Sequence, residues 1–298
     1  MSDIRAPNRD GVLAAARSVA AILPPTPLLP VEIGGVRCHV KAESLQPVGA
    51  FKIRGGWWRL SNLDDMERAR GVIAVSSGNH AQGVAWAARR LGIAAAIVMP
   101  RNAPQVKLQA TRALGAEIVL YDRPGQNRDD VAAKLVEERG AVLVHAFGDP
   151  WVIEGQGSAG IEIEAQLGRA PSRLLVCCGG GGLAAGLALA CPESAIHIVE
   201  PHGWDMVGRA IAAGEVVHVG ENPPSTICDA LQPDATEAAT CNPMRRCGSP
   251  AHSRRGRDLY APPRPGGGFS PIPPYISTVS RLYLARPGGG LRGRRYRG

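Results

Sequence analysis

Apolar and polar residues alternate in blocks along the middle of the chain, from about residue 71 to residue 218. Short runs rich in valine, isoleucine and alanine are separated by longer segments with the apolar spacing of a helix. We predict strands at 71–77, 93–99, 117–121, 141–145, 173–178 and 195–200. We predict helices at 80–91, 104–114, 127–139, 154–167, 183–190 and 204–213.

The ends of these segments support the same pattern. Several predicted helices stop at a glycine, such as Gly92, Gly140 and Gly168. Glycine takes the left-handed conformation after a helix without the steric cost of a Cβ atom. Strands that alternate with helices through short connections are typical of βαβ units. We therefore predict an α/β fold built on parallel sheet.

The last part of the chain differs in composition. Residues 242–298 hold twelve arginines, no lysine and one acidic residue, Asp258, so the formal net charge of +8 belongs to this tail. Its many prolines and glycines leave no helical or strand period, which is typical of disorder. We predict that residues 236–298 are disordered or translated out of frame. Arginines attract nucleic-acid phosphates, but no recognition module is visible, so we do not expect nucleic-acid binding.

Several classes of protein are excluded by the rest of the sequence. No apolar run is long enough to span a membrane, and the first residues lack the apolar core of a signal peptide. The seven cysteines are odd in number and form no CxxC pair, which favours reduced thiols and a cytoplasmic location. Cys241, Cys247 and His252 lack a second ligand pair, so we expect no metal site.

One lysine has an unusual setting. Lys52 lies between Phe51 and Ile53 in the stretch ESLQPVGAFKIRGG (43–56), and the chain has only four lysines against 30 arginines. A lone lysine with apolar neighbours is usually a surface residue whose stem lies on the core. The alternative is an amine that burial keeps out of water, which lowers its pKa and frees it to act as a nucleophile.

Four consecutive glycines, at 179–182, follow a predicted strand and precede a helix predicted to begin at Leu183. The backbone N–H groups of such a loop, together with the positive end of the helix dipole, bind phosphate without a charged side chain. The spacing matches neither a P-loop nor a dinucleotide fingerprint. A plain strand–helix turn needs one or two glycines, so four of them favour a phosphate site.

A second strand–helix junction lies in the stretch VSSGNHAQG (75–83). Hydroxyls, an amide and free N–H groups meet here at the start of a helix, as in a carboxylate or phosphate site. Serine and asparagine are also the preferred N-cap residues, so an ordinary cap explains the pattern equally well. His80, in the first helical turn, is either a general base or a structural residue.

Together the three stretches indicate pyridoxal phosphate. The glycine loop suits the phosphate of this cofactor, and the serine and asparagine loop suits an anionic substrate group. Lys52 supplies the amine that the aldehyde of the cofactor needs to form a Schiff base. Beside the other two motifs, we interpret Lys52 as a functional residue.

The three stretches, in this order, resemble the serine/threonine dehydratases (threonine ammonia-lyases) of the fold-type II, tryptophan synthase β-like, pyridoxal phosphate enzymes. TPLLP (26–30), GQGSAGIEI (155–163), VEP (199–201) and STICDAL (225–231) also match the running pattern of that family. The resemblance covers about residues 10–235. It implies a two-domain fold of open parallel sheets, with a large cofactor-binding domain (1–67 and 151–235), a small domain (68–150) and an active site between them.

The resemblance also implies roles for individual residues. Lys52 would bind the cofactor covalently and move the Cα proton of the substrate, and Phe51 would pack near the cofactor ring. Asn79 would bind the 3′-oxygen of the ring. Ser77 would exchange a proton on the opposite face in racemising relatives. The substrate carboxylate would be held by Ser76, Ser77, Gly78 and His80, and the phosphate by Gly179, Gly180, Gly181, Gly182 and Leu183.

The implied activity is α,β-elimination from a small hydroxy amino acid, L-threonine or L-serine, to a 2-oxo acid and ammonia. Serine racemase and hydroxyaspartate dehydratase share the fold and remain alternatives, as does a non-catalytic cofactor-binding protein with a basic tail. The resemblance implies a homodimer. Three departures matter. Val48 stands where family members usually have threonine, which the turn made by Pro47 and Gly49 tolerates. Glu200 matches one of two acidic metal ligands of some relatives, and the second position falls near Asp205–Met206, so we expect no metal site. The serine or cysteine that binds the pyridine nitrogen has no counterpart after residue 235, so we expect impaired activity.

Overall fold

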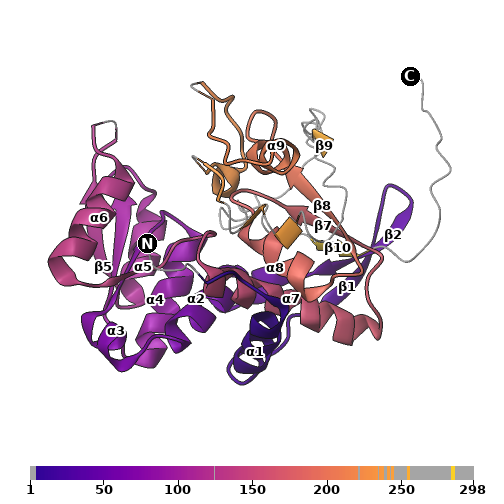
Figure 1. The fold of residues 1–298 in the computed structure, drawn as a ribbon, viewed down its shortest axis with the longest axis horizontal. Coiled ribbons are helices and arrows are strands. Elements are labelled where there is room, and N and C mark those ends of the chain that lie inside the picture. The colour runs from indigo at the N-terminus through magenta and orange to yellow at the C-terminus, as the bar shows by residue number, and fades with distance from the viewer. Residues whose placement is uncertain are drawn as a thin grey trace, which may run out of the picture.

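In the computed structural model, the described residues are 5–123, 125–220, 222–233, 235–237, 240–241 and 243–244, with the backbone of two short strands at 254–255 and 283–285. Two separate β-sheets, each with its own helices, make up this part of the chain (Figure 1). The predicted α/β fold with parallel sheets is therefore confirmed. None of the helices in the described ranges combines the length and hydropathy needed to cross a bilayer.

The smaller sheet has four parallel strands in the order β5-β4-β3-β6. Its elements are α3 (Asp65–Arg70), β3 (Val72–Val75), α4 (Asn79–Leu91), β4 (Ala95–Pro100), α5 (Gln105–Ala113), β5 (Glu117–Tyr121), α6 (Arg128–Arg139) and β6 (Val142–Leu143). Successive residues of a strand point to opposite faces. Val72 and Ala74 therefore pack in the core with α4, whereas Ile73 packs with Ala132 and Leu135 of α6.

The larger sheet has six strands in the order β1-β2-β10-β7-β8-β9. Its strands are β1 (Leu28–Ile33), β2 (Val36–Lys41), β7 (Arg173–Cys177), β8 (Ala195–Glu200), β9 (Arg254–Arg255) and β10 (Tyr283–Ala285). Strands β7, β8 and β9 are parallel, whereas β1 and β2 form an antiparallel hairpin and β10 is antiparallel to both of its neighbours. This sheet is mixed, not purely parallel. Gly34 and Gly35, both at positive φ, form the tight hairpin turn.

The remaining elements are α1 (Arg9–Ala20), the short 3-10 turn η1 (Glu43–Leu45), α2 (Lys52–Ser61), α7 (Pro150–Leu167), α8 (Gly182–Ala190), α9 (Met206–Ala213) and the 3-10 turn η2 (Asp229–Leu231). Helix α2 lies between the two sheets (Figure 1). It packs very closely on its neighbours, since a Cβ atom on Gly56 would lie 2.7 Å from the carbonyl oxygen of Gly83 in α4. A Cβ atom on Gly155 of α7 would lie 2.6 Å from the Cα of Gly55.

The structure agrees with the predicted strands and helices of residues 71–218 to within a few residues at each end. The helix predicted at 154–167 begins earlier, at Pro150, because Asp149 caps it and proline suits its first turn. Before residue 71 the prediction missed α1, β1, β2, α2 and α3. The proposed domain boundaries at 67 and 150 stay a proposal, and the first of them falls within α3. Most of the predicted disordered tail lies outside the described residues.

Candidate active site

Lys52 is the first residue of α2, and its side chain is half-buried. The Nζ atom donates a hydrogen bond to the carbonyl oxygen of Ala146 at 2.5 Å and lies 5.4 Å from the centre of the Phe51 ring. Burial lowers the pKa of Lys52 to about 8. Roughly a tenth of this lysine is therefore neutral amine at pH 7 and roughly half at pH 8, far more than for a solvated lysine. The neutral form is the one that a nucleophile or a proton acceptor requires.

His80 lies beside Lys52 in the first turn of α4 and is buried. Its Nε2 atom is 2.9 Å from the carbonyl oxygen of Val144, so Nε2 carries the hydrogen and Nδ1 is an acceptor. Nδ1 has no hydrogen-bond partner among the described residues. Burial, with a smaller effect from the charge of Lys52, lowers the pKa of His80 to about 3. His80 is therefore neutral, and it adds no positive charge to the site.

The serine and asparagine loop connects the end of β3 to the start of α4. Ser76 accepts a hydrogen bond on its Oγ from the backbone N–H of Gly78 at 3.1 Å. Gly78 occupies the N-cap position of α4, and no side chain at that position bonds the first turn. The ordinary N-cap that the sequence allowed is therefore not formed by the serines. The loop brings Ser76, Ser77, Gly78 and Asn79 to one helix start, as predicted.

The glycine loop connects β7 to α8, which begins at Gly182 and not at Leu183. Packing and backbone geometry explain much of its sequence. A Cβ atom on Gly180 would lie 2.3 Å from the ring of Phe147, and one on Gly179 would lie 3.2 Å from the Cα of Leu231. Gly181 has a φ of +86°. The expectation that four glycines exceed what a turn needs is therefore corrected, and the case for phosphate rests on the helix start.

The helices of the fold begin in two ways, with or without a side-chain cap. Side chains at the N-cap positions bond the first turns of α1, α3, α6 and α7, through Asn8, Asp64, Asn127 and Asp149. Helices α2, α4 and α8, which carry the predicted site residues, have no such side-chain cap. Helices α5 and α9 also lack one, but the start of α9 is bonded by the carboxylate of Glu200 instead. Uncapped N–H groups and the helix dipole favour anions. The starts of α4 and α8 therefore fit a carboxylate and a phosphate.

One segment that the sequence analysis missed connects all three motifs. The carbonyl group of Val144 accepts from His80, and that of Ala146 accepts from Lys52. Phe147 packs against Gly180 and Gly182 of the glycine loop. His145 accepts from the N–H of Gly148 at 2.8 Å, and burial, with the charge of Lys52, lowers its pKa to about 4. Backbone carbonyls carry no sequence signature, so no motif could have identified residues 144–148.

Glu200, the predicted counterpart of a metal ligand, is buried at the end of β8. Its two carboxylate oxygens accept from the N–H groups of Val207 and Gly208 at 2.8 and 3.0 Å, so they serve the start of α9. The described residues contain no group of three side chains suited to a metal ion. Of the cysteine and histidine set considered from the sequence, Cys247 and His252 lie outside the described residues.

The chain matches the model of the pyridoxal-phosphate dependent enzyme family over residues 19–252. It belongs to this family. The match covers most of the chain and includes all the predicted site residues, and the cofactor of the family is pyridoxal 5′-phosphate. Lys52 and the uncapped starts of α4 and α8 fit this group.

Relatives in the family have several activities. The chain is 41% identical over 202 residues to the L-threo-3-hydroxyaspartate ammonia-lyase of Pseudomonas sp., a match that covers 66% of the chain and 62% of that relative. It is 36% identical over 234 residues to the serine racemase of Schizosaccharomyces pombe, over 76% of the chain and 71% of that relative. It is 40% identical over 204 residues to the L-threonine ammonia-lyase of Thermotoga maritima, over 67% of the chain and 50% of that relative.

Solved structures agree with this assignment. Maize serine racemase superposes with a TM-score of 0.75 at 33% identity, over 84% of the chain and 76% of that structure. The T.th. threonine deaminase superposes with a TM-score of 0.72 at 41% identity, over 80% of the chain and 79% of that structure. The chain is thus a family member that spans less than two thirds of the length of the Pseudomonas relative.

Proposed function

We propose that this protein binds pyridoxal 5′-phosphate through Lys52 and catalyses the α,β-elimination of L-threonine and L-serine to 2-oxobutanoate or pyruvate and ammonia. The observation that carries the proposal is the segment 144–147. Through two backbone carbonyls and the Phe147 ring it connects the buried amine of Lys52, the start of α4 and the start of α8. Residues of the proposed covalent anchor, carboxylate site and phosphate site thereby all contact one segment.

When bound, the cofactor supplies an electron sink for the pair that the Cα–H bond releases. Lys52 takes up the Cα proton, because its lowered pKa of about 8 leaves a neutral amine available. The hydrogen bond to the carbonyl of Ala146 fixes the direction of Nζ. His80 and His145 stay neutral near Lys52, so neither histidine adds a positive charge that would repel the protonated amine.

Two helix starts orient the anionic groups. We assign the phosphate to the N–H groups of the loop Gly179–Gly182 and of Leu183, at the start of α8. We assign the substrate carboxylate to the loop from Ser76 to His80, at the start of α4. Asn79 then contacts the oxygen of the cofactor ring, Phe51 packs beside the ring, and Ser77 faces the substrate.

The surroundings of Lys52 favour a substrate with an uncharged side chain. Phe51 and Phe147 are apolar, and the two histidines nearby are neutral. A substrate with a carboxylate in its side chain would find no positive charge among these four residues to pair with. This argues for threonine and serine as substrates. The names of the relatives support two further candidates, L-threo-3-hydroxyaspartate and racemisation of serine. A homodimer is proposed on the resemblance alone.

The visible absorption spectrum tests the cofactor assignment. Wild type, Lys52→Ala and the exposed-lysine control Lys134→Ala are titrated with pyridoxal phosphate. We expect the absorption band of lysine-bound cofactor in wild type and in Lys134→Ala, and none in Lys52→Ala. An equal band in all three proteins would overturn the assignment of Lys52.

Product analysis tests the reaction. Each protein is incubated with L-threonine, L-serine and L-threo-3-hydroxyaspartate, and the 2-oxo acid, ammonia and D-serine are measured. Equal molar yields of 2-oxobutanoate and ammonia from threonine support the proposal. Turnover of hydroxyaspartate alone, or D-serine without a 2-oxo acid, would replace it with one of the two alternatives.

A further inference from the structure

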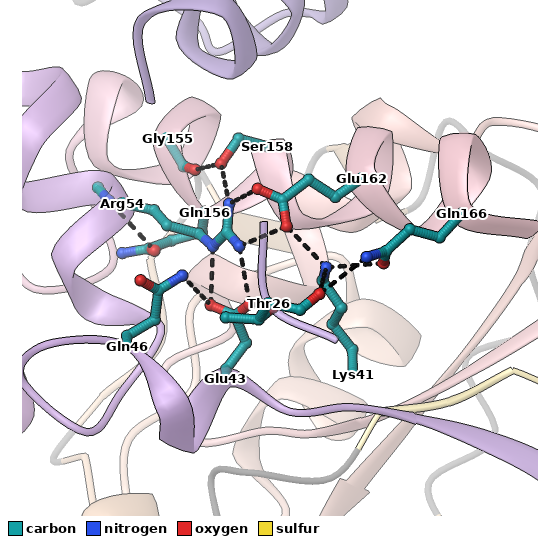
Figure 2. A network of polar contacts seen from close by, with 11 residues as sticks. Thr26, Lys41, Glu43, Gln46, Arg54, Gly155, Gln156, Ser158, Glu162 and Gln166 are labelled. Carbon is teal, nitrogen blue, oxygen red and sulfur yellow. Dashed lines mark hydrogen bonds and ion pairs between the residues drawn. The ribbon is translucent and has the colours of Figure 1, made fainter. Parts of the chain in front are cut away.

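A network of buried charged groups connects Glu43, nine residues before Lys52, to Arg54 in α2 and to Glu162 in α7 (Figure 2). Arg54, Lys41 and Glu43 have no exposed surface, and the Glu162 side chain is 16% exposed. Two of these residues are cations and two are carboxylates, so their charges balance. The neutral members drawn with them are Thr26, Gln46, Gly155, Gln156, Ser158 and Gln166.

Arg54 is at the centre of the network. Its Nε and Nη2 atoms donate to the two oxygens of Glu43 at 2.7 and 2.8 Å. Its Nη1 and Nη2 atoms donate to the two oxygens of Glu162 in α7 at 2.7 and 2.8 Å. Nη1 also donates to the hydroxyl of Ser158 at 3.2 Å. The planar guanidinium thus forms a two-pronged contact with each of two carboxylates, which fixes direction as well as distance.

The side chains of this network stabilise the charged forms of one another. Burial alone would raise the pKa of Glu43, but the contact with Arg54 keeps that pKa below its ordinary value. The two carboxylates raise the pKa of Arg54 despite burial. Lys41 completes the set, with Nζ 2.6 Å from Glu162 and 2.9 Å from the side-chain oxygen of Gln166. Each carboxylate is therefore paired with a cation, Glu43 with no exposed surface and Glu162 with little.

The contact between Arg54 and Glu43 joins two positions that are 11 residues apart, and Lys52 lies between them. The first turn of α2 has no side-chain cap to hold it. The side-chain oxygen of Gln156 also accepts from the N–H of Gly55 at 3.3 Å, and Gly55 packs closely on Gly155 of α7. Arg54 adds to this packing the ion pairs that tie the start of α2 to Glu43 in the preceding loop and to Glu162 in α7.

We propose that Arg54 is a positioning residue that holds Lys52 out of water and aimed at the carbonyl of Ala146, by fixing the loop 43–51 and the first turn of α2 to α7. The proposal rests on the proposed function, in which Lys52 is the reactive amine. Lysine cannot replace arginine here, because an ammonium is a point charge and cannot form two forked contacts at once.

A shift of this loop has a measurable consequence at Lys52. The pKa of Lys52 is lowered by burial, and the titratable groups that face it, His80 and His145, are both neutral. Phe51, on the other side, is apolar. If the loop loosens, water reaches Nζ and the pKa rises toward its ordinary value of 10.5.

The test is the pKa of Lys52 in the cofactor-free full chain, measured by competitive acetylation over a range of pH and mass spectrometry of the peptide that contains Lys52. Arg54→Lys keeps the positive charge and loses the two-pronged contacts with Glu43 and Glu162. A rise in the pKa of Lys52 from about 8 to about 9 would lower the neutral fraction at pH 8 from about one half to about one tenth. We expect acetylation of Lys52 at pH 8 to become about fivefold slower or slower still.

Lys41→Met is the matched control. Lys41 is buried to the same extent and contacts the same Glu162. Among the described residues it makes no hydrogen bond or ion pair with the loop 43–51 or with α2, on which it acts only through the charges of Glu43 and Arg54. We expect it to lower the thermal midpoint while the pKa of Lys52 stays near 8. Glu43→Gln keeps the shape of the side chain and removes the charge that pairs with Arg54, although the carboxylate also accepts from Thr26 and Gln46. It serves as a second test if Arg54→Lys does not fold. It should raise the pKa of Lys52.

In the cofactor-loaded enzyme, Arg54→Lys should lower kcat for the preferred substrate at least fivefold and change KM less than twofold. An unchanged pKa of Lys52 in both Arg54→Lys and Glu43→Gln would overturn the proposal. An equal rise in Lys41→Met would also overturn it, because the effect would then be a general loss of packing. Acetylation needs no cofactor, so it tests the role of Arg54 independently of the proposed function. A failure of the proposed function is detected separately, by the visible spectrum of Lys52→Ala.

Discussion

Lys52 and His80 lie on different helices and donate hydrogen bonds to carbonyl groups that are two residues apart in one segment. Lys52 reaches the carbonyl of Ala146 at 2.5 Å, and His80 reaches that of Val144 at 2.9 Å. The same burial acts on both side chains and lowers both pKa values. The site therefore holds an amine and an imidazole whose neutral forms are favoured at a pH where one or both would be charged in water.

The reaction of Lys52 with the cofactor should follow the pKa of this amine. Because burial lowers that pKa to about 8, the rate of covalent attachment should rise about fivefold from pH 7 to pH 8 and level off above pH 9. Stopped-flow absorbance after mixing cofactor-free protein with pyridoxal phosphate measures this rate. A rate that still increases tenfold per pH unit above pH 9 would mean that Lys52 is an ordinary, solvated lysine.

His80 should make the fold less stable in acid. Its pKa is about 3 in the folded chain and about 6.5 when unfolded, so the unfolded chain takes up the proton first. The stability that its neutral form contributes is complete above pH 6.5 and is lost as the pH falls toward 3. Relative to His80→Gln, wild type should lose about 2–3 kcal/mol of unfolding free energy between pH 7 and pH 4. Urea unfolding at each pH measures the difference, and a constant difference would contradict a neutral, buried His80.

Glu200 should make the fold less stable as the pH rises, the opposite of the effect of His80. Burial raises its pKa to about 7, against an ordinary value of 4.5, so the folded chain binds this proton more tightly than the unfolded chain. Its contribution is present in acid and is lost as the pH rises through 7. Relative to Glu200→Gln, which stays neutral, wild type should lose about 2 kcal/mol between pH 5 and pH 8. The same unfolding series measures both residues, and two slopes of equal sign would show that one of the two pKa directions is wrong.

Gly180 should tolerate no side chain while Phe147 is present. A Cβ atom there would lie 2.3 Å from the Phe147 ring, so Gly180→Ala should cost about 1–3 kcal/mol of unfolding free energy. Phe147→Ala removes the obstacle, and the double variant should lose less than the sum of the two single variants.

Gly78→Ala is the control for this pair. Gly78 has a negative φ, and a Cβ atom there would meet nothing within 4 Å, so its stability should stay within about 0.5 kcal/mol of wild type. Thermal and urea unfolding of the four variants test the contact. Additive losses in the double variant would mean that Phe147 does not press on the glycine loop.

Local sequence signals predicted the two strand–helix junctions of the candidate site. The strand–helix junctions at 75–79 and 177–182 are marked by small and polar residues between apolar runs, and the structure has these junctions where they were predicted. Lys52 stood out through its apolar neighbours, and it is half-buried with a lowered pKa. These features depend on neighbours in the chain, so periodicity and turn residues are enough to find them.

Two kinds of feature were missed because they depend on distant residues. The sequence analysis gave Arg54 no role, yet it is fully buried and pairs with Glu43 and with Glu162, which is 108 residues away. The carbonyls of Val144 and Ala146 could belong to any two residues. What makes them part of the site is that α2 and α4 place Lys52 and His80 beside them.

The sequence by itself determined the alternation of strands and helices over residues 71–218, the family motifs and the candidate lysine, because these are set by local periodicity, turn residues and side-chain chemistry. Only the tertiary structure decided that the larger sheet is mixed, that His80 is neutral, that Arg54 pairs with Glu43 and Glu162, and that Lys52 and His80 bond the segment 144–148. Sheet pairing, burial and buried charge pairs depend on segments far apart in the chain, and no local pattern records them.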